Sequence, residues 1–270
     1  MTGFYRLVTS NTQKQKMLQS QDIRNTLFGI FLLLTLTSCR ENGIKDIRNH
    51  YFPLRELTEG MAYEYQPVIN DSLTPAYWYY RSFFTDDGIF LTKTYYEYEL
   101  LPLQLSREEV VSNGMLLQNI YLYEQDSTGK QHKIEAEVLS GSAFPFQVRD
   151  SGGVFLYKIR WNPLSDPEAT ITLVKNRQYV KDTVVNFENK DLDAVIFDVR
   201  ELVEYDKEGV FEHQYNGREI YAEGLGLFYY EKKVADDFQW AYRLEKRYPM
   251  SELEEKYKER IRENISPGEF

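Results

Sequence analysis

The chain has 270 residues, and 32 Lys and Arg stand against 42 Asp and Glu, so its formal net charge is −10 at pH 7. A net negative chain repels phosphate backbones, and nucleic acid is therefore not expected as a partner. The single cysteine, Cys39, excludes an internal disulfide and a thiolate metal site, so the fold must be stabilised by an ordinary hydrophobic core.

An uncharged apolar run from Leu27 to Leu36 is the first element of the chain. It is too short to span a bilayer, which takes about 20 apolar residues. Basic residues precede the run and small residues follow it, which is the order of a secretory signal peptide. Residues 1–38 are therefore predicted to be a signal peptide. Met17 is a second candidate start, because a signal that begins at Met1 exceeds the usual length of about 15–30 residues.

The motif Leu36-Thr37-Ser38-Cys39 resembles the lipobox of bacterial lipoproteins. This resemblance implies that the Cys39 thiol carries a lipid such as palmitate, and that cleavage makes Cys39 the N-terminus. It also implies a location in the cell envelope, where the lipid holds the protein to a membrane. We expect this to be the outer membrane, with the periplasmic and the surface side both open. Residues 39–50 are polar and are predicted to be the lipidated N-terminus and a tether.

From Tyr51 onward, runs rich in Tyr, Phe, Val, Ile and Thr alternate with Asp, Asn and Gly clusters, which is typical of strands joined by turns. Residues 51–270 are predicted to form one mainly β domain, an antiparallel curved sheet or half-barrel-like meander with a C-terminal α-helix. The predicted strands are 61–69, 76–84, 89–100, 115–124, 131–139, 153–161, 169–180, 194–205, 210–215, 218–223, 226–233 and 238–247.

The clearest hairpin signal is Asn216-Gly217, because both residues tolerate the positive φ that a type I′ turn requires. Such a turn would pair Tyr215 with Arg218 and His213 with Ile220. This register sorts apolar from polar side chains and gives His213 a role in sheet packing rather than in catalysis. It also predicts that Gly217→Val destabilises the fold by about 1 kcal/mol or more.

The C-terminal helix is predicted from the capping box Ser251-Glu252-Leu253-Glu254. Its apolar stripe, which contains Leu253 and Tyr257, is narrow and is expected to lie along an edge of the sheet. A second stretch, residues 106–111, is compatible with a single helical turn.

No group of residues in the sequence predicts catalysis, a cofactor or a metal. The histidines at 50, 132 and 213 are too scattered for a zinc motif. The pairs Asp86-Asp87 and Asp236-Asp237 are interpreted as solvated turns, because the carboxylates of a glycosidase must face each other. We therefore expect a protein that is not an enzyme and needs no cofactor.

Aromatic residues gather in three runs, Tyr77-Trp78-Tyr79-Tyr80, Tyr95-Tyr96-Glu97-Tyr98 and Phe228-Tyr229-Tyr230. Alternate residues of a strand point to opposite faces, so one set of rings can pack the core while the other lines an exposed or concave surface. The simpler alternative is that tyrosine suits a half-wet sheet. The candidate ligand-facing aromatics are Tyr77, Tyr79, Tyr95 and Phe228.

A second resemblance rests on Tyr51-Phe52-Pro53-Leu54, on residues 60–65 and on Tyr221-Ala222-Glu223-Gly224-Leu225-Gly226-Leu227. These stretches are similar to uncharacterised envelope lipoproteins of Bacteroidetes-type bacteria. The resemblance implies O-glycosylation at Asp-Ser/Thr-apolar motifs, for which the chain offers three candidates. They are Ser72, Ser127 and Thr183.

The function predicted from these observations is that of a lipid-anchored, non-catalytic accessory or assembly subunit. Its expected partners are the membrane, through the N-terminal lipid, and an envelope protein. Two alternatives stay open: a carrier of apolar ligands or lipoproteins with a half-barrel cavity, and a surface glycan-binding module. A deep apolar cavity would favour the carrier, a flat exposed aromatic face the glycan binder, and neither feature the assembly role.

Overall fold

The computed structural model describes residues 43–69, 72–149, 153–236 and 238–264, with side chains described up to residue 259. The chain divides into two compact units, Met1–Gly43 and Ile44–Phe270. The second unit contains all the secondary structure of the described residues. No helix in this described part has the length and apolarity that a membrane crossing requires.

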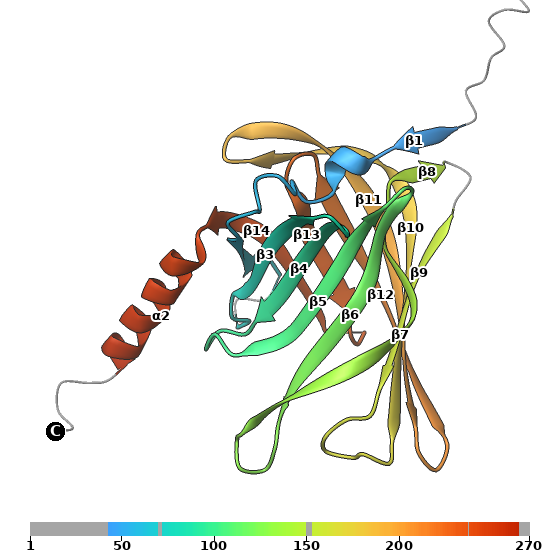
Figure 1. Ribbon diagram of the computed structural model, residues 1–270, viewed down its shortest axis with the longest axis vertical. Helices are drawn as coiled ribbons and strands as arrows, with labels where there is room; N and C mark the ends of the chain where they lie inside the picture. The colour runs from blue at the N-terminus through green and yellow to red at the C-terminus, as the bar shows by residue number, and fades with distance from the viewer. Residues whose placement is uncertain (1–42, 70–71, 150–152, 237, 265–270) are drawn as a thin grey trace, which may run out of the picture. The chain divides into compact units, whose positions relative to one another are not determined.

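Twelve antiparallel strands of this unit form one closed barrel (Figure 1), so the mainly β fold is confirmed. The strands follow one another around the barrel in chain order, and the last one closes it by pairing with the first. The barrel strands are β2 (Met61–Pro67), β3 (Ala76–Thr85), β4 (Gly88–Tyr96), β5 (Pro102–Val111), β6 (Gly114–Gln125), β7 (Gln131–Pro145), β9 (Val154–Trp161), β10 (Thr170–Phe187), β11 (Lys190–Asp206), β12 (Val210–Ala222), β13 (Gly226–Lys233) and β14 (Gln239–Tyr248).

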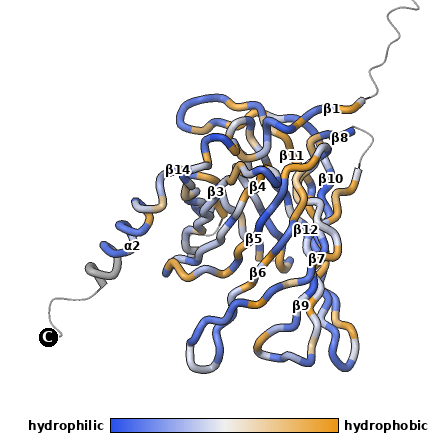
Figure 2. The backbone as a smooth tube through the Cα atoms, in the orientation of Figure 1, coloured by the Kyte–Doolittle hydropathy of each residue, from blue (hydrophilic) through white to orange (hydrophobic). Residues whose placement is uncertain are grey.

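Short turns explain why neighbours in sequence are neighbours in the sheet. The β3–β4 turn at Asp86-Asp87, the β6–β7 turn and the β11–β12 turn lie where the sequence predicts them. In the β6–β7 turn, Asp126 Oδ1 accepts hydrogen bonds from the backbone N–H of Thr128 at 2.8 Å and of Lys130 at 3.1 Å. This is an Asx turn, in which a side chain replaces a backbone acceptor. Polar and apolar segments alternate along the strands (Figure 2), because the two faces of the sheet meet different surroundings.

One end of the barrel is covered by the segment that precedes β2. Strand β1 (Ile44–Asp46) pairs with β8 (Gln147–Arg149), and the 3-10 turn η1 (Arg48–His50) follows it. Ile47 is fully buried and its N–H donates to the Phe146 carbonyl at 2.9 Å. Residues 44–50, which the sequence assigns to the tether, are therefore part of the folded unit.

Aromatic rings fill the part of the barrel interior next to this segment. Phe52 packs on Tyr80 with ring centroids 4.2 Å apart, and Tyr63 meets Tyr80 edge-on at 4.7 Å. Such pairs contribute about 0.5–1.5 kcal/mol beyond the burial of their area. The largest fully buried rings are those of Tyr63, Tyr65, Tyr80, Phe144 and Phe197.

The C-terminal helix α2 (Met250–Asn264) is confirmed. Of its described side chains, Leu253 is fully buried, in a small cluster with Ala62, Tyr77 and Tyr248 that is separate from the main core. The Lys256 ammonium lies 3.4 Å from a Glu64 carboxylate oxygen. The buried Leu253, the Lys256–Glu64 ion pair and the Lys256 ammonium above the Tyr248 ring thus attach the helix to β2 and β14.

The hairpin predicted at Asn216-Gly217 is wrong, because β12 runs through both residues without a turn. Gly217 pairs with Val199 on one side and with Lys232 on the other. A Cβ atom at position 217 would lie 2.1 Å from the backbone oxygen of Glu231, so the glycine permits a close approach of β13 rather than a turn.

Two further expectations from the sequence are also wrong, because the strands concerned are continuous. His213 pairs with Val203 and is exposed, so the packing role derived from the hairpin register is wrong. Residues 106–111 form no helical turn but belong to β5, where they pair with β4 and β6. In both places the sheet partners on each side decide the conformation, and local sequence cannot show them.

Candidate ligand-binding cavity inside the barrel

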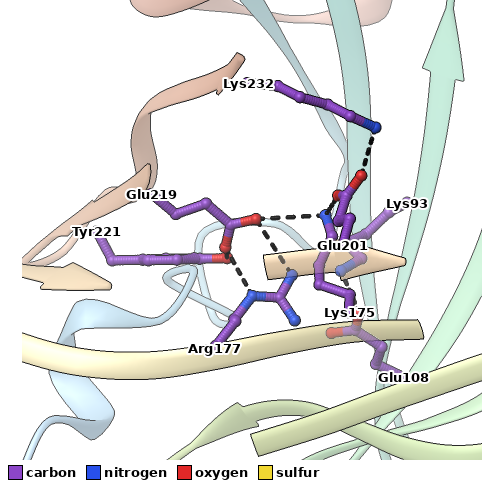
Figure 3. Close-up of polar contacts among 8 residues, drawn as sticks. All are labelled: Lys93, Glu108, Lys175, Arg177, Glu201, Glu219, Tyr221 and Lys232. Carbon is purple, nitrogen blue, oxygen red and sulfur yellow. Dashed lines mark hydrogen bonds and ion pairs between the residues drawn. The ribbon is translucent and has the colours of Figure 1, made fainter. Parts of the chain in front are cut away.

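Charged side chains from opposite sides of the barrel converge on its interior (Figure 3). Strands β4 and β5 provide Lys93 and Glu108, and β10 to β13 provide the rest. Strands β4 and β5 lie far from β10 to β13 in the sheet order. Because side chains from both groups of strands line one cavity, these side chains must point into the barrel. The interior charged cluster consists of Lys93, Glu108, Lys175, Arg177, Glu201, Glu219 and Lys232.

Glu219 is the best-connected carboxylate of the interior charged cluster. It accepts hydrogen bonds from Arg177 Nε at 2.7 Å and Arg177 Nη2 at 3.3 Å. The Tyr221 hydroxyl donates to it at 3.0 Å, and Lys175 Nζ lies 3.5 Å away. The fork of two guanidinium donors fixes the orientation of both partners, which a single lysine contact would not do.

A second carboxylate, Glu201, bridges two ammonium groups. Lys175 Nζ lies 2.8 Å from one oxygen, and Lys232 contacts the other. The Lys232 ammonium also lies 4.1 Å from the ring centroid of Tyr215, in a cation–π contact. Lys175 therefore connects Glu201 and Glu219 into one network.

Glu108 joins the cluster to the segment that covers the barrel end. It is only 2% exposed, pairs with Lys93, and accepts a hydrogen bond from the Tyr51 hydroxyl. Burial and the neighbouring Glu108 carboxylate raise the pKa of Tyr51 well above its usual value, so this hydroxyl stays a donor.

The ion pairs decide the protonation of the two bridging carboxylates. Burial alone would raise the pKa of Glu219, but Arg177 and Lys175 outweigh it and lower the pKa to about 2. Burial likewise opposes the charge of Glu201, but the ammonium groups of Lys175 and Lys232 outweigh it and lower the pKa of Glu201 to about 2. Both carboxylates are therefore ionised at neutral pH.

A cavity of about 230 Å³ lies beside these groups. Five members of the cluster line it, among them Lys175, Arg177 and Glu219. The rest of its wall is largely aromatic and aliphatic, including Leu117, Leu173 and Leu227. The aromatic rings of the wall belong to Phe52, Trp78, Tyr80, Tyr157, Tyr221, Tyr230 and Trp240. Rings with a few convergent polar groups are the usual composition of a small-molecule site.

Two donors in this wall have no acceptor among the described protein atoms. One is Arg177 Nη1, whose sister nitrogens both face Glu219. The other is the hydroxyl of Ser106, which is 2% exposed. A buried donor without an acceptor costs about 1–3 kcal/mol, so such groups are uncommon in a wall that serves packing alone.

The four aromatic residues predicted from the sequence lie in three different places. Tyr77 packs with Leu253 of α2, and the half-buried Tyr79 covers Gly60. Tyr95 stacks on Trp78 at 5.0 Å, and burial raises its pKa to about 12. Phe228 belongs to the main core. None of the four is among the described residues that line the cavity.

The candidates for covalent modification also lie in different places. Cys39 is outside the described residues. Ser72 is exposed, and Ser127 is exposed in the β6–β7 turn. Thr183 is half-buried in β10, paired with Ala194, rather than at a turn.

The interior charged cluster was not predicted from the sequence, and a cavity was expected only under the carrier alternative. Two residues of the interior charged cluster, Lys175 and Arg177, are spaced two apart in β10, and this spacing places them on one face. This spacing is the sequence signal from which an inward-facing charged cluster could have been inferred. It does not say which face turns inward, because the other face of β10 is polar too, with Asn176 and Gln178.

No protein-family model matches this chain, and no curated protein matches it either. Two solved structures are similar to it. A predicted lipoprotein of Parabacteroides distasonis is 10% identical with a TM-score of 0.43, covering 73% of this chain and 97% of that one. A predicted exported protein with a YmcC-like fold from Bacteroides fragilis is 13% identical with a TM-score of 0.40, covering 73% of this chain and 98% of that one. Similarities at this level carry no conclusion about function.

Proposed function

We propose that this chain is a lipid-anchored, non-catalytic protein of the cell envelope that binds a small polar molecule inside its barrel. The observation that carries the proposal is the cavity of about 230 Å³, lined by aromatic rings and by the interior charged cluster. Sites for drug-sized ligands have about 300–1,000 Å³, so this volume suits a smaller molecule.

The protonation of the cluster supports binding rather than catalysis. A general acid or base works best when its pKa lies near the operating pH. The pKa values of Glu201 and Glu219 are about 2, and both carboxylates are held by cations. These carboxylates are therefore suited to holding the cations of the cluster in place, not to exchanging protons with a ligand.

The same wall argues against the apolar carrier. An acyl chain in this cavity would cover Arg177 and Ser106 without offering an acceptor to Arg177 Nη1 and Ser106 Oγ, which have none among the described protein atoms. Burying such donors under hydrocarbon is costly unless they are hydrogen-bonded. A polar ligand can supply the acceptor, so the geometry favours it over a bare hydrocarbon.

Ligand binding can be tested on the mature protein purified from the envelope under native conditions. We expect native mass spectrometry to find a small bound molecule, and a library of polar metabolites to raise the melting temperature saturably. Trp240→Ala should abolish the shift because Trp240 lines the cavity, and Phe211→Ala, at a residue that is 67% exposed, should leave it intact. A protein with no bound molecule and no shift from any compound would contradict the proposal.

The anchor is tested separately, by changing the predicted lipidation site. Cys39→Ala should release the domain from the membrane or leave an uncut precursor, because acyl chains contribute about 0.8 kcal/mol per buried CH₂. Membrane fractionation and mass spectrometry of the N-terminus measure both outcomes. An unmodified Cys39 in a mature protein free of membrane would disprove the anchor.

An accessory role beside another envelope protein is the second candidate. It is favoured by two large apolar side chains at the β11–β12 hairpin, Val210 and Phe211, which are 59% and 67% exposed. A photo-crosslinking residue at position 211 should then give one discrete protein adduct in cells. The same residue at Glu137, which is also exposed, is the control. Adducts that do not differ between the two positions would contradict a specific partner.

A further inference from the structure

We infer that the molecule held in the barrel is a small monoanion, namely a monocarboxylate with an apolar body, seated on Arg177 Nη1 and Ser106 Oγ. This inference rests on the proposed function, that the cavity binds a small polar molecule. It adds the charge of the ligand and the two donors that recognise it.

The charge balance of the interior charged cluster is the first argument. Its four cations, three lysines and Arg177, face three carboxylates, so one positive charge is in excess. Charge is costly to bury unless it is compensated. A monoanion compensates the excess, a neutral ligand leaves it, and a cation doubles it.

The unpaired donors are the second argument. Glu219 takes the Nε and Nη2 edge of Arg177, so Nη1 is the guanidinium nitrogen left for another acceptor. Ser106 lines the same cavity, and its buried hydroxyl, which has no partner among the described protein atoms, can donate one proton. A carboxylate has two acceptor oxygens, and hydrogen bonds between ionised partners are about twice as strong as neutral ones.

The remaining wall sets the rest of the ligand. Two carboxylates, Glu108 and Glu219, also line the cavity, but each is already paired, with Lys93 and with Arg177 respectively. Because only one positive charge of the cluster is unmatched, the cavity can compensate one negative charge on a ligand but not two. The rest of the wall is largely aromatic and aliphatic, and such a wall stabilises a ring or short chain rather than a bare inorganic ion.

The ligand charge can be tested by calorimetric titration of the intact mature protein with matched probes. The anions are phenylacetate, 4-hydroxybenzoate and hexanoate, and the neutral and cationic counterparts are phenylacetamide and phenethylammonium. We expect at least one carboxylate to bind saturably and more tightly than its amide by about tenfold, the effect of one charge-assisted hydrogen bond. Equal binding of acid and amide would overturn the inference, as would no binding of any carboxylate.

Two substitutions test the donors. Ser106→Ala should weaken carboxylate binding by about tenfold, and it should not lower the melting temperature of the unliganded protein. A hydroxyl with a purely structural role would not give both results, the weaker carboxylate binding and the unchanged melting temperature. Arg177→Lys keeps a cation beside Glu219 but removes Nη1, and it should weaken binding similarly. Arg160→Lys, in an exposed pair with Glu137, is the control. Carboxylate affinities equal to those of the control in both variants would overturn the inference.

The outcomes separate the inference from the proposed function. A neutral or cationic molecule found in the native protein, with binding lost in Trp240→Ala but unchanged in Ser106→Ala, would refute the monoanion and keep the binding function. A protein that binds no small molecule would refute both.

Discussion

Glu219→Ala is expected to lower the free energy of unfolding by about 3–5 kcal/mol, the usual cost of removing one partner from a buried ion pair. The carboxylate side chain is only 9% exposed and holds both Arg177 and Lys175. Without it, these two cations face each other inside the barrel, and the Tyr221 hydroxyl loses its acceptor. Urea denaturation at pH 7 measures the loss, with circular dichroism to report whether the variant folds.

For Glu219→Ala we also predict how the loss of stability depends on pH. The folded-state pKa of Glu219 is about 2 and its ordinary value is 4.5, so the unfolded chain binds the proton more readily. Stability from this carboxylate is therefore fully present above about pH 4.5 and is lost as the pH falls towards 2. The difference in unfolding free energy between wild type and Glu219→Ala should shrink over that interval.

Glu137→Ala provides the matched control, because Glu137 is paired with Arg160 at the surface, with both side chains about half exposed. Surface pairs contribute about 0–1 kcal/mol, so this variant should remain close to wild type at every pH. Equal losses in the two variants, or a difference that does not change with pH, would show that the interior ion pairs do not hold the barrel together.

Gly217→Ala is expected to destabilise the protein by about 3 kcal/mol, at the upper end of the cost of overpacking. The added Cβ would lie 2.1 Å from the backbone oxygen of Glu231, and a sheet backbone cannot move away without breaking the β12–β13 pairing. The larger Gly217→Val should cost at least as much. Thermal and urea unfolding measure both variants.

Gly153→Ala is the control for Gly217, because its new Cβ would lie no closer than 3.6 Å to the ring of Phe155. A change of this kind stays within about 0.5 kcal/mol. A Gly217→Ala variant as stable as Gly153→Ala would mean that β12 and β13 do not approach each other as closely as the backbone indicates.

The mainly β class, most strand positions and the C-terminal helix could be predicted from the sequence because they depend on local patterns. Alternating aromatic and β-branched residues favour strands wherever they occur. The motif Ser251-Glu252-Leu253-Glu254 predicts the helix locally, although the helix begins one residue earlier, at Met250. Turns such as that at Asp126 are equally local, since the side chain binds N–H groups two and four residues further on.

The continuous β12 shows where local signals fail. Asn216 and Gly217 can form a type I′ turn, and in isolation nothing opposes it. In the barrel, β11 pairs with β12 along its whole length, and β13 pairs with it from Asn216 to Ala222. The sheet thus overrides the turn propensity, and the glycine has a steric purpose that its sequence neighbours do not reveal.

The sequence by itself determined the strand content, the helix and the alternation that puts Lys175 and Arg177 on one face. Only the tertiary structure decided which face turns inward, and that Lys93 and Glu108 of β4 and β5 line one cavity with Glu219 of β12. The physical reason is that strand closure is a long-range event. The pairing of β14 with β2 joins residues at opposite ends of the domain, and this closure brings the charges of β4 and β5 and those of β10 and β12 around one cavity.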